Sequence, residues 1–169
     1  MKQLVECVPN ISEGRDHEKI KIISQIVEEI DGIKLLNVDP GKATNRTVIT
    51  FVGPPETIVD AAYSLISKAK ELIDMRSHKG EHPRMGAVDV CPFIPISGVS
   101  MNETVDLAHE LGKRVGSELL IPVYCYENAA KSNLRVNLAN CRSGEYEGLK
   151  NKLRDVKWKP DYGPNKFNE

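Results

Sequence analysis

Apolar residues recur at two different spacings along this chain, and the order of these spacings restricts its fold most. Residues 16–31, 54–75 and 102–117 carry aliphatic side chains three and four positions apart, which predicts three amphipathic helices. Shorter apolar runs, several rich in β-branched residues, lie between and around them, which predicts strands. These runs are residues 3–8, 33–38, 46–52, 87–96 and 119–126.

The predicted order is strand, helix, strand, strand, helix, strand, helix, strand, which favours an α+β sandwich. We expect a ferredoxin-like split βαβ arrangement, with a mixed sheet and the helices on one face. A single layer of helices leaves the other face of the sheet uncovered. The sequence therefore predicts a sheet with one open side.

Local signals refine the boundaries of these elements. Asp16 is placed to cap the first helix, and residues 39–41, Asp-Pro-Gly, are a turn signal. Pro92 and Pro95 place the fourth predicted strand at a sheet edge or at a bulge. A further short helix is expected over residues 145–153.

Length and charge bound the class of function. The chain has 169 residues, which fits one domain. Lysine and arginine number 23 against 24 aspartate and glutamate residues, so the formal charge is -1. Such a balance supplies no overall field for nucleic acid or for an anionic membrane. An anionic ligand must therefore be held by a local pocket.

The cysteines and the N-terminal residues predict the compartment. The four cysteines are widely scattered and form no Cys-x-x-Cys pair, so buried reduced thiols are expected. The first ten residues lack the apolar core of a signal peptide, and no run approaches the length of a membrane span. We expect a cytoplasmic protein.

Residues 76–91, RSHKGEHPRMGAVDVC, are the densest polar segment of the chain. They hold two histidines, two arginines, a lysine and two carboxylates around glycines and a proline. Three interpretations are open: a metal site that uses His78 and His82, an exposed basic loop, and general acid or base chemistry by His82. Gly80 disfavours a helix here, and Pro83 pushes His82 toward extended geometry. The two rings should then not share a helical face, which favours acid–base chemistry over a metal site.

Other polar loops are expected to meet this segment at one end of the sheet, where binding groups concentrate. Residues 9–15 and 39–47 are two such loops. Their neutral groups can orient a ligand, and their cationic groups suit a dicarboxylate such as an acidic amino acid. Phosphate-binding glycine motifs are absent from the sequence. The candidate binding residues are Asn10, Ser12, Asp39, Asn45, Arg46, His78, Lys79 and Arg84.

Five segments of the chain resemble the N-terminal subdomain of formimidoyltransferases. They are LVECVPNISEG, NRTVITFVG, LIDMRSHKGEHPRMGAVDVCPFIPISGVSM, IPVYCYE and DYGP, and the resemblance spans residues 1–169. It implies transfer of a formimino or formyl group between 5-formimidoyl- or 5-formyltetrahydrofolate and L-glutamate. His82 matches the family's catalytic histidine, and Gly163 and Pro164 match the start of its folate-binding stretch. No metal is implied.

The resemblance leaves two classes of function open, because family members have a second subdomain that this chain lacks. The first is a transferase half in histidine and one-carbon metabolism, completed by a second-subdomain polypeptide or by self-association. The second is a noncatalytic module that binds folate or a partner protein. An amidohydrolase that binds a metal through His78 and His82 is a weaker third possibility.

Overall fold

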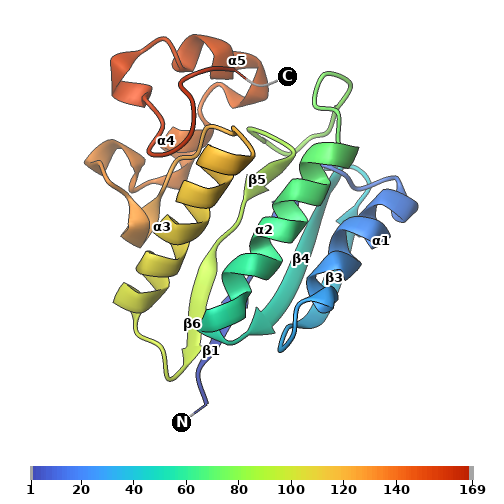
Figure 1. The fold of residues 1–169 in the computed structure, drawn as a ribbon. Coiled ribbons are helices and arrows are strands. Elements are labelled where there is room, and N and C mark those ends of the chain that lie inside the picture. Colours follow the sequence, from blue (N-terminus) through green and yellow to red (C-terminus); the bar gives the residue numbers. More distant parts are fainter. Residues whose placement is uncertain (1, 168–169) are drawn as a thin grey trace.

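A curled antiparallel sheet is the centre of the fold in a computed structural model that describes residues 2–167 (Figure 1). Its strands are β1 (Leu4–Cys7), β2 (Asn10–Ile11), β3 (Lys34–Gly41), β4 (Arg46–Gly53), β5 (Val88–Val90) and β6 (Phe93–Ser97). The α-helices are α1 (His17–Gln25), α2 (Pro55–Leu72), α3 (Met101–Glu118), α4 (Leu138–Arg142) and α5 (Glu145–Lys152). Short 3-10 helices are η1 (Ile26–Glu29), η2 (Glu127–Ala129), η3 (Asn133–Arg135) and η4 (Val156–Trp158).

The strand order places β4 in the middle of the sheet. β3 pairs along one side of β4, while β1 and then β2 pair along its other side. β6 and β5 lie outside β1 and β2, and form the edge. Every one of these pairings is antiparallel, so the expectation of a mixed sheet was wrong. The reason is that each helical crossover skips one strand, so parallel strands are never neighbours.

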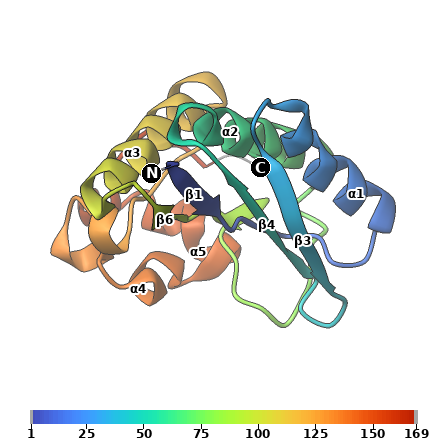
Figure 2. The same ribbon diagram turned by 90° about the horizontal axis from the view of Figure 1, so that it is seen from below.

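Helices α1, α2 and α3 cover one face of the sheet (Figure 2), and the burial of β4 shows why. Thr47, Ile49 and Phe51 point to the helices and are fully buried. Val48 and Thr50 alternate with them and are only partly buried, as the two-residue period of a strand requires. In residues 2–167, no second layer of helices covers the far face of β3 and β4, while α4 and α5 lie at one end of the molecule (Figure 1).

The helices begin at the residues that their capping chemistry selects. The side chain of Asp16 accepts hydrogen bonds from the backbone N–H groups of Glu18 and Lys19, as predicted. Ser100 and Glu103 form a capping box at the start of α3. Pro55 occupies the first turn of α2, where a missing N–H costs nothing. The predicted helix over residues 145–153 is α5.

Two local predictions were wrong. Residues 39–41 continue β3 and pair with Val48, Thr47 and Arg46, so the turn falls on residues 42–45 instead. Residues 119–126 form no strand and make only the isolated bridge Val123–Tyr162. Their donors are used elsewhere, because Cys125 N donates to the carboxylate of Asp161. The edge position expected from Pro92 and Pro95 is confirmed, and the run splits there into β5 and β6.

All four cysteines are free thiols, and Cys7, Cys125 and Cys141 are buried. Cys7 and Cys91 face each other with 3.6 Å between their sulfur atoms. Burial raises the pKa of Cys7 well above the usual value, and its contact with Cys91 adds to this effect. Within residues 2–167, no helix combines the length and the apolar character that crossing a membrane requires.

The core predicts a large cost for truncating Phe51. This ring is fully buried between the sheet and the helices, so Phe51→Ala should lower the free energy of unfolding by about 3–5 kcal/mol. Val156 is 89% exposed, and Val156→Ala should stay within about 0.5 kcal/mol of the wild type. Urea unfolding of the three proteins measures both values, and equal losses in the two variants would contradict this assignment of the core.

Candidate functional site

The buried side chain of Asn45 joins three polar loops at one end of the sheet. Its Oδ1 accepts from Gly14 N at 2.9 Å, and its Nδ2 donates to Lys79 O at 3.0 Å. Asn45 itself lies in the β3–β4 turn with a φ of 47°, a left-handed conformation that asparagine tolerates. The predicted meeting of residues 9–15, 39–47 and 78–89 is therefore present in the structure.

Further contacts hold the first and third of these loops together. Ser12 Oγ donates to Gly86 O at 2.7 Å, and Ser12 N donates to Ala87 O at 2.9 Å. Gly80 passes so close to the turn that an added Cβ would lie 2.2 Å from Thr44 O. Only glycine fits at that position without movement of the backbone. Residues 76–86 form no helix, so His78 and His82 do not share a helical face.

His78 is buried, and the hydrogen bonds of its ring fix its tautomer. Arg84 Nε lies 3.0 Å from His78 Nδ1. A guanidinium can only donate, so Nδ1 accepts and the proton is on Nε2. Nε2 then donates to Asn45 O at 2.8 Å. Both ring nitrogens are thus used within the protein, which connects His78 to the loop junction rather than to a ligand.

Arg84 is buried and connects the polar segment to α5. Its guanidinium contacts Glu145 at 2.9 Å and Glu147 at 2.7 Å. The hydrogen bond with Glu147 lowers the pKa of that carboxyl. Tyr146 N also donates to Arg84 O at 2.9 Å. Local sequence patterns do not indicate these partners, because more than sixty residues separate them from Arg84.

A second ion pair attaches α4 to the other end of the same segment. The carboxylate of Asp89 accepts from Met85 N at 3.0 Å and from Arg142 Nε at 2.9 Å. The Asp89 side chain is 1% exposed, so this pair is shielded from solvent. Helices α4 and α5 therefore fix residues 84–89 from both sides. Arg142, Glu145 and Glu147 are site residues that sequence patterns alone did not identify.

His82 is half-buried and contacts the first residue of β4. Arg46 Nη1 lies 2.7 Å from His82 Nε2, and because the guanidinium must donate, Nε2 accepts and Nδ1 carries the proton. Burial lowers the pKa of His82, and the positive charges of Arg46 and Arg142 lower it further, while Asp89 and Glu145 partly oppose them. The ring is therefore neutral near pH 7 and able to accept a proton.

Asn10, Asp39 and Arg46 lie on the open face of the sheet. Asn10 and Asp39 pair with Val48 from opposite sides, and Arg46 points to the same face two residues earlier on β4. Asn10 is buried and donates to Val8 O at 3.1 Å. Asp39 is exposed, as is Lys79 in the neighbouring segment. These residues and His82 form a polar rim at the end of the open face.

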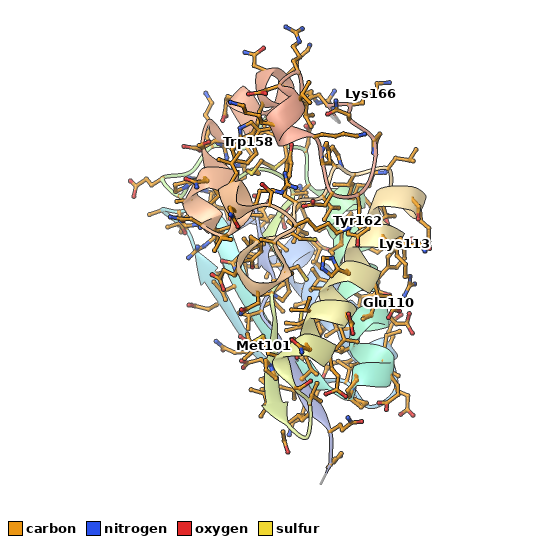
Figure 3. The ribbon with its side chains drawn as sticks, turned by 90° about the vertical axis from the view of Figure 1, so that its left-hand side faces the viewer. Met101, Glu110, Lys113, Trp158, Tyr162 and Lys166 are labelled. Carbon is orange, nitrogen blue, oxygen red and sulfur yellow. The ribbon has the colours of Figure 1, made fainter. Side chains whose placement is uncertain are left out.

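Gly163 and Pro164 lie apart from this rim, beside α3. Gly163 has a φ of 80°, and an added Cβ would lie 2.2 Å from Ile121 O and 2.9 Å from its carbonyl carbon. The neighbouring Tyr162 packs on Gly112 of α3, as Figure 3 shows by its position beside this helix. The backbone of Tyr162 pairs with that of Val123. Gly163 and Pro164 therefore adjoin residues 121–126 rather than the loop junction.

A largely apolar cavity of about 460 Å³ opens between α3, the β5–β6 edge and residues 121–129. Tyr124 and Tyr126 line it together with Met85 and Gly86. Burial raises the pKa of Tyr124 to about 12, and Tyr124 Oη donates to Trp158 O at 2.6 Å. The volume lies in the range of small-molecule sites. Because Met85 is three residues after His82, at most about 11 Å of chain separates the two.

Among residues 2–167, no three His, Cys, Asp or Glu side chains are grouped so that they could hold a metal ion. His78 and His82, the pair considered for a metal, each have a ring nitrogen in contact with an arginine. The structure therefore gives no specific support to a metal site built on these two histidines.

Comparison with known proteins gives a consistent family match. Residues 4–169 match the model of the formiminotransferase domain, N-terminal subdomain. The chain is 56% identical to the formimidoyltransferase-cyclodeaminase of Rattus norvegicus, with 99% of the chain and 31% of that protein covered. It is 50% identical to the glutamate formimidoyltransferase of Thermoplasma acidophilum (95% and 54% covered) and 42% identical to that of Streptococcus pyogenes (99% and 56%). The chain thus spans between just under a third and just over half of the length of these relatives.

The arrangement around Arg84 predicts a stability effect that an exposed arginine does not show. Arg84→Met leaves His78 Nδ1 buried without its donor, so the free energy of unfolding should fall by about 1–3 kcal/mol. The matched variant Arg76→Met removes an ion pair to Asp74 whose side chains are 67% and 48% exposed, and should cost less than about 1 kcal/mol. Urea unfolding at pH 7 measures both.

The effect of Arg84→Met should also depend on pH. The pKa of Glu147 is lowered in the folded protein, so its pairing with Arg84 stabilises the fold above the ordinary glutamate value of 4.5 and is lost as the pH falls through the lowered pKa. The Glu147 side chain is 65% exposed, so the pH-dependent contribution of this ion pair to stability is small. A difference from the wild type that grows on acidification would contradict the pairing.

Proposed function

This chain belongs to the formiminotransferase family through its N-terminal subdomain, and we propose that it carries the acid–base half of a folate-dependent transferase site. The reaction is transfer of a formimino or formyl group between N5 of 5-formimidoyl- or 5-formyltetrahydrofolate and the amino group of L-glutamate. The observation that carries this proposal is the neutral His82 at the polar rim of an open sheet face.

His82 is proposed to move one proton between two nitrogen atoms. Attack of the glutamate nitrogen on the amidine carbon requires the ammonium to lose a proton, which the imidazole accepts. The same proton then passes to N5 of tetrahydrofolate as the bond from N5 to the transferred carbon breaks. Histidine suits both steps, because the ordinary pKa of an imidazole lies near neutrality.

Glutamate is proposed to bind at the polar rim. Arg46 and Lys79 offer cationic donors there, and Arg46 can form the paired hydrogen bonds that a carboxylate accepts. Asp39 offers an anionic acceptor for the ammonium group. Arg84 was also a candidate for this role, but it contacts Glu145 and Glu147, so we assign carboxylate binding to Arg46 and Lys79 first.

The ring system of folate is proposed to occupy the cavity lined by Tyr124 and Tyr126. Three features support this placement: the volume of about 460 Å³, the mainly apolar lining with two aromatic rings, and the nearness of Met85 to His82 in the chain. Gly163 and Pro164 adjoin the far side of residues 121–126, through the Val123–Tyr162 bridge. They support the wall of this cavity and can contact the folate tail beyond it.

The open sheet face supports a site that is completed by another body. The relatives named above are about two to three times as long as this chain. We propose that a second subdomain, in the same or another polypeptide, or a second copy, covers this face. The strand order, in which each crossover skips one antiparallel strand, supports a ferredoxin-like split βαβ topology. We also propose a cytoplasmic location and service in one-carbon metabolism linked to histidine.

The decisive assay measures glutamate-dependent release of tetrahydrofolate by this chain, alone and mixed with a polypeptide that carries the second subdomain (the second half). The transferase proposal expects turnover in the mixture. The noncatalytic alternative expects folate binding without turnover in either sample. A sample that neither binds 5-formyltetrahydrofolate nor turns over would reject both.

Substitution of His82 tests the mechanism. In the mixture, His82→Ala should lower turnover by about 10² to 10⁴, which is the usual contribution of a general acid–base group, while the affinity for 5-formyltetrahydrofolate stays nearly unchanged. His17→Ala is the matched control, since His17 is exposed at the start of α1. A His82→Ala variant that keeps more than half of the turnover would remove His82 from the mechanism.

Filling the cavity tests the folate position. Ala108 lines the cavity from α3, so Ala108→Phe should weaken binding of 5-formyltetrahydrofolate at least about tenfold, which corresponds to about 1.4 kcal/mol. Glu110→Phe adds the same ring to the same helix at an exposed position and should leave the affinity unchanged. Titration calorimetry of both variants measures this, and equal affinities would place folate elsewhere.

A further inference from the structure

The contact between Arg46 and His82 blocks the nitrogen that a general base needs. With the proton on Nδ1, the only lone pair of the neutral ring is on Nε2. That lone pair accepts the hydrogen bond from Arg46 Nη1 at 2.7 Å. While this bond lasts, Nε2 cannot take a proton from a substrate. The geometry shown is therefore a resting state of the proposed base.

Arg46 has unused hydrogen-bonding capacity. Its Nε is buried and lacks a hydrogen-bond partner among residues 2–167, although buried donors are nearly always satisfied. A carboxylate that accepts from Nε and from a neighbouring guanidinium nitrogen would satisfy it in the paired geometry typical of arginine. Because the Nε atom is enclosed, a carboxylate can reach it only after the Arg46 side chain turns, and this turn would take Nη1 away from His82.

The other charges near His82 are already neutralised by partners. Arg142 from α4 is paired with Asp89 of β5, and Glu145 from α5 is paired with Arg84. Arg46 from β4 is the cation in direct contact with the ring. Its charge therefore dominates the change that a bound anion would make at His82.

We propose that Arg46 is a substrate-operated gate, which releases Nε2 of His82 when a carboxylate of the amino-acid substrate takes the guanidinium. This inference rests on the proposed function, because it assumes that the accepting amine carries a carboxylate. After release, Nε2 accepts the ammonium proton, and the amine nitrogen is free to attack. An amine without a carboxylate leaves the gate closed, so Arg46 also determines which amines react.

The gate predicts how the pKa of His82 responds to substitution and to L-glutamate. In the free chain, Arg46→Gln should raise the pKa of His82, because a neighbouring positive charge is removed. In the wild-type chain combined with its second half, saturating L-glutamate should raise it as well. In Arg46→Gln, L-glutamate should cause no further rise. Lys42→Gln removes a charge from the exposed β3–β4 turn and should change nothing.

The measurement is an NMR titration of ¹⁵N-labelled histidine, with the His82 signal assigned by its loss in His82→Gln. The ¹⁵N shifts of the free wild type should also show the proton on Nδ1. An equal pKa in wild type and Arg46→Gln, or an unchanged pKa in the presence of bound L-glutamate, would overturn the gate. Turnover assayed in parallel separates the two proposals. Normal turnover with an unresponsive His82 rejects the gate alone, whereas absence of turnover in the mixture rejects the proposed function.

Discussion

The buried amide of Asn45 is the interaction on which the rest of the site depends. This side chain accepts from the backbone N–H of Gly14 in the first loop and donates to the backbone carbonyl of Lys79 in the third. The backbone carbonyl of Asn45 accepts a hydrogen bond from the ring of His78. An amide presents a donor and an acceptor in one rigid plane, so a single side chain sets the distance between two loops. Arg46 directly follows Asn45, and His82 is three residues after Lys79, whose carbonyl Asn45 holds. The junction therefore brings Arg46 and His82 close together.

The C-terminal helices extend the same constraint. Arg84 forms an ion pair with α5, and Asp89 forms one with α4. Helices near the C-terminus therefore determine the conformation of the polar segment, which lies more than fifty residues earlier in the chain. This explains why the polar segment is ordered although it has no regular secondary structure. His82 lies between the two anchored points, His78 and Arg84, and its neutral ring results from burial and from the cations around it.

Sequence patterns predicted much of this molecule, and the exceptions have physical causes. Periodicity located the three long helices and the main strands, and the polar density of residues 76–91 located the loop junction. Sequence patterns could not show that Asp39 and Gly41 extend β3, because a turn signal and a strand end look alike when the partner strand is unknown. The cavity beside α3 and the partners of Arg84 depend on contacts between distant residues, which local patterns do not encode. The edge position of residues 87–96 was predictable because proline limits backbone pairing locally.

The position of β1 in the sheet has a consequence for how the protein is made. β1 pairs with β4 on one side and with β6 on the other, as in the match of Cys7 with Phe51 and with Phe93. On the ribosome, the first strand therefore emerges long before either neighbour exists. Its apolar side chains stay unpaired until more than forty further residues are synthesised, and the outer edge closes only after residue 97. Such long-range pairing slows folding and leaves apolar surface exposed on the nascent chain until the sheet closes.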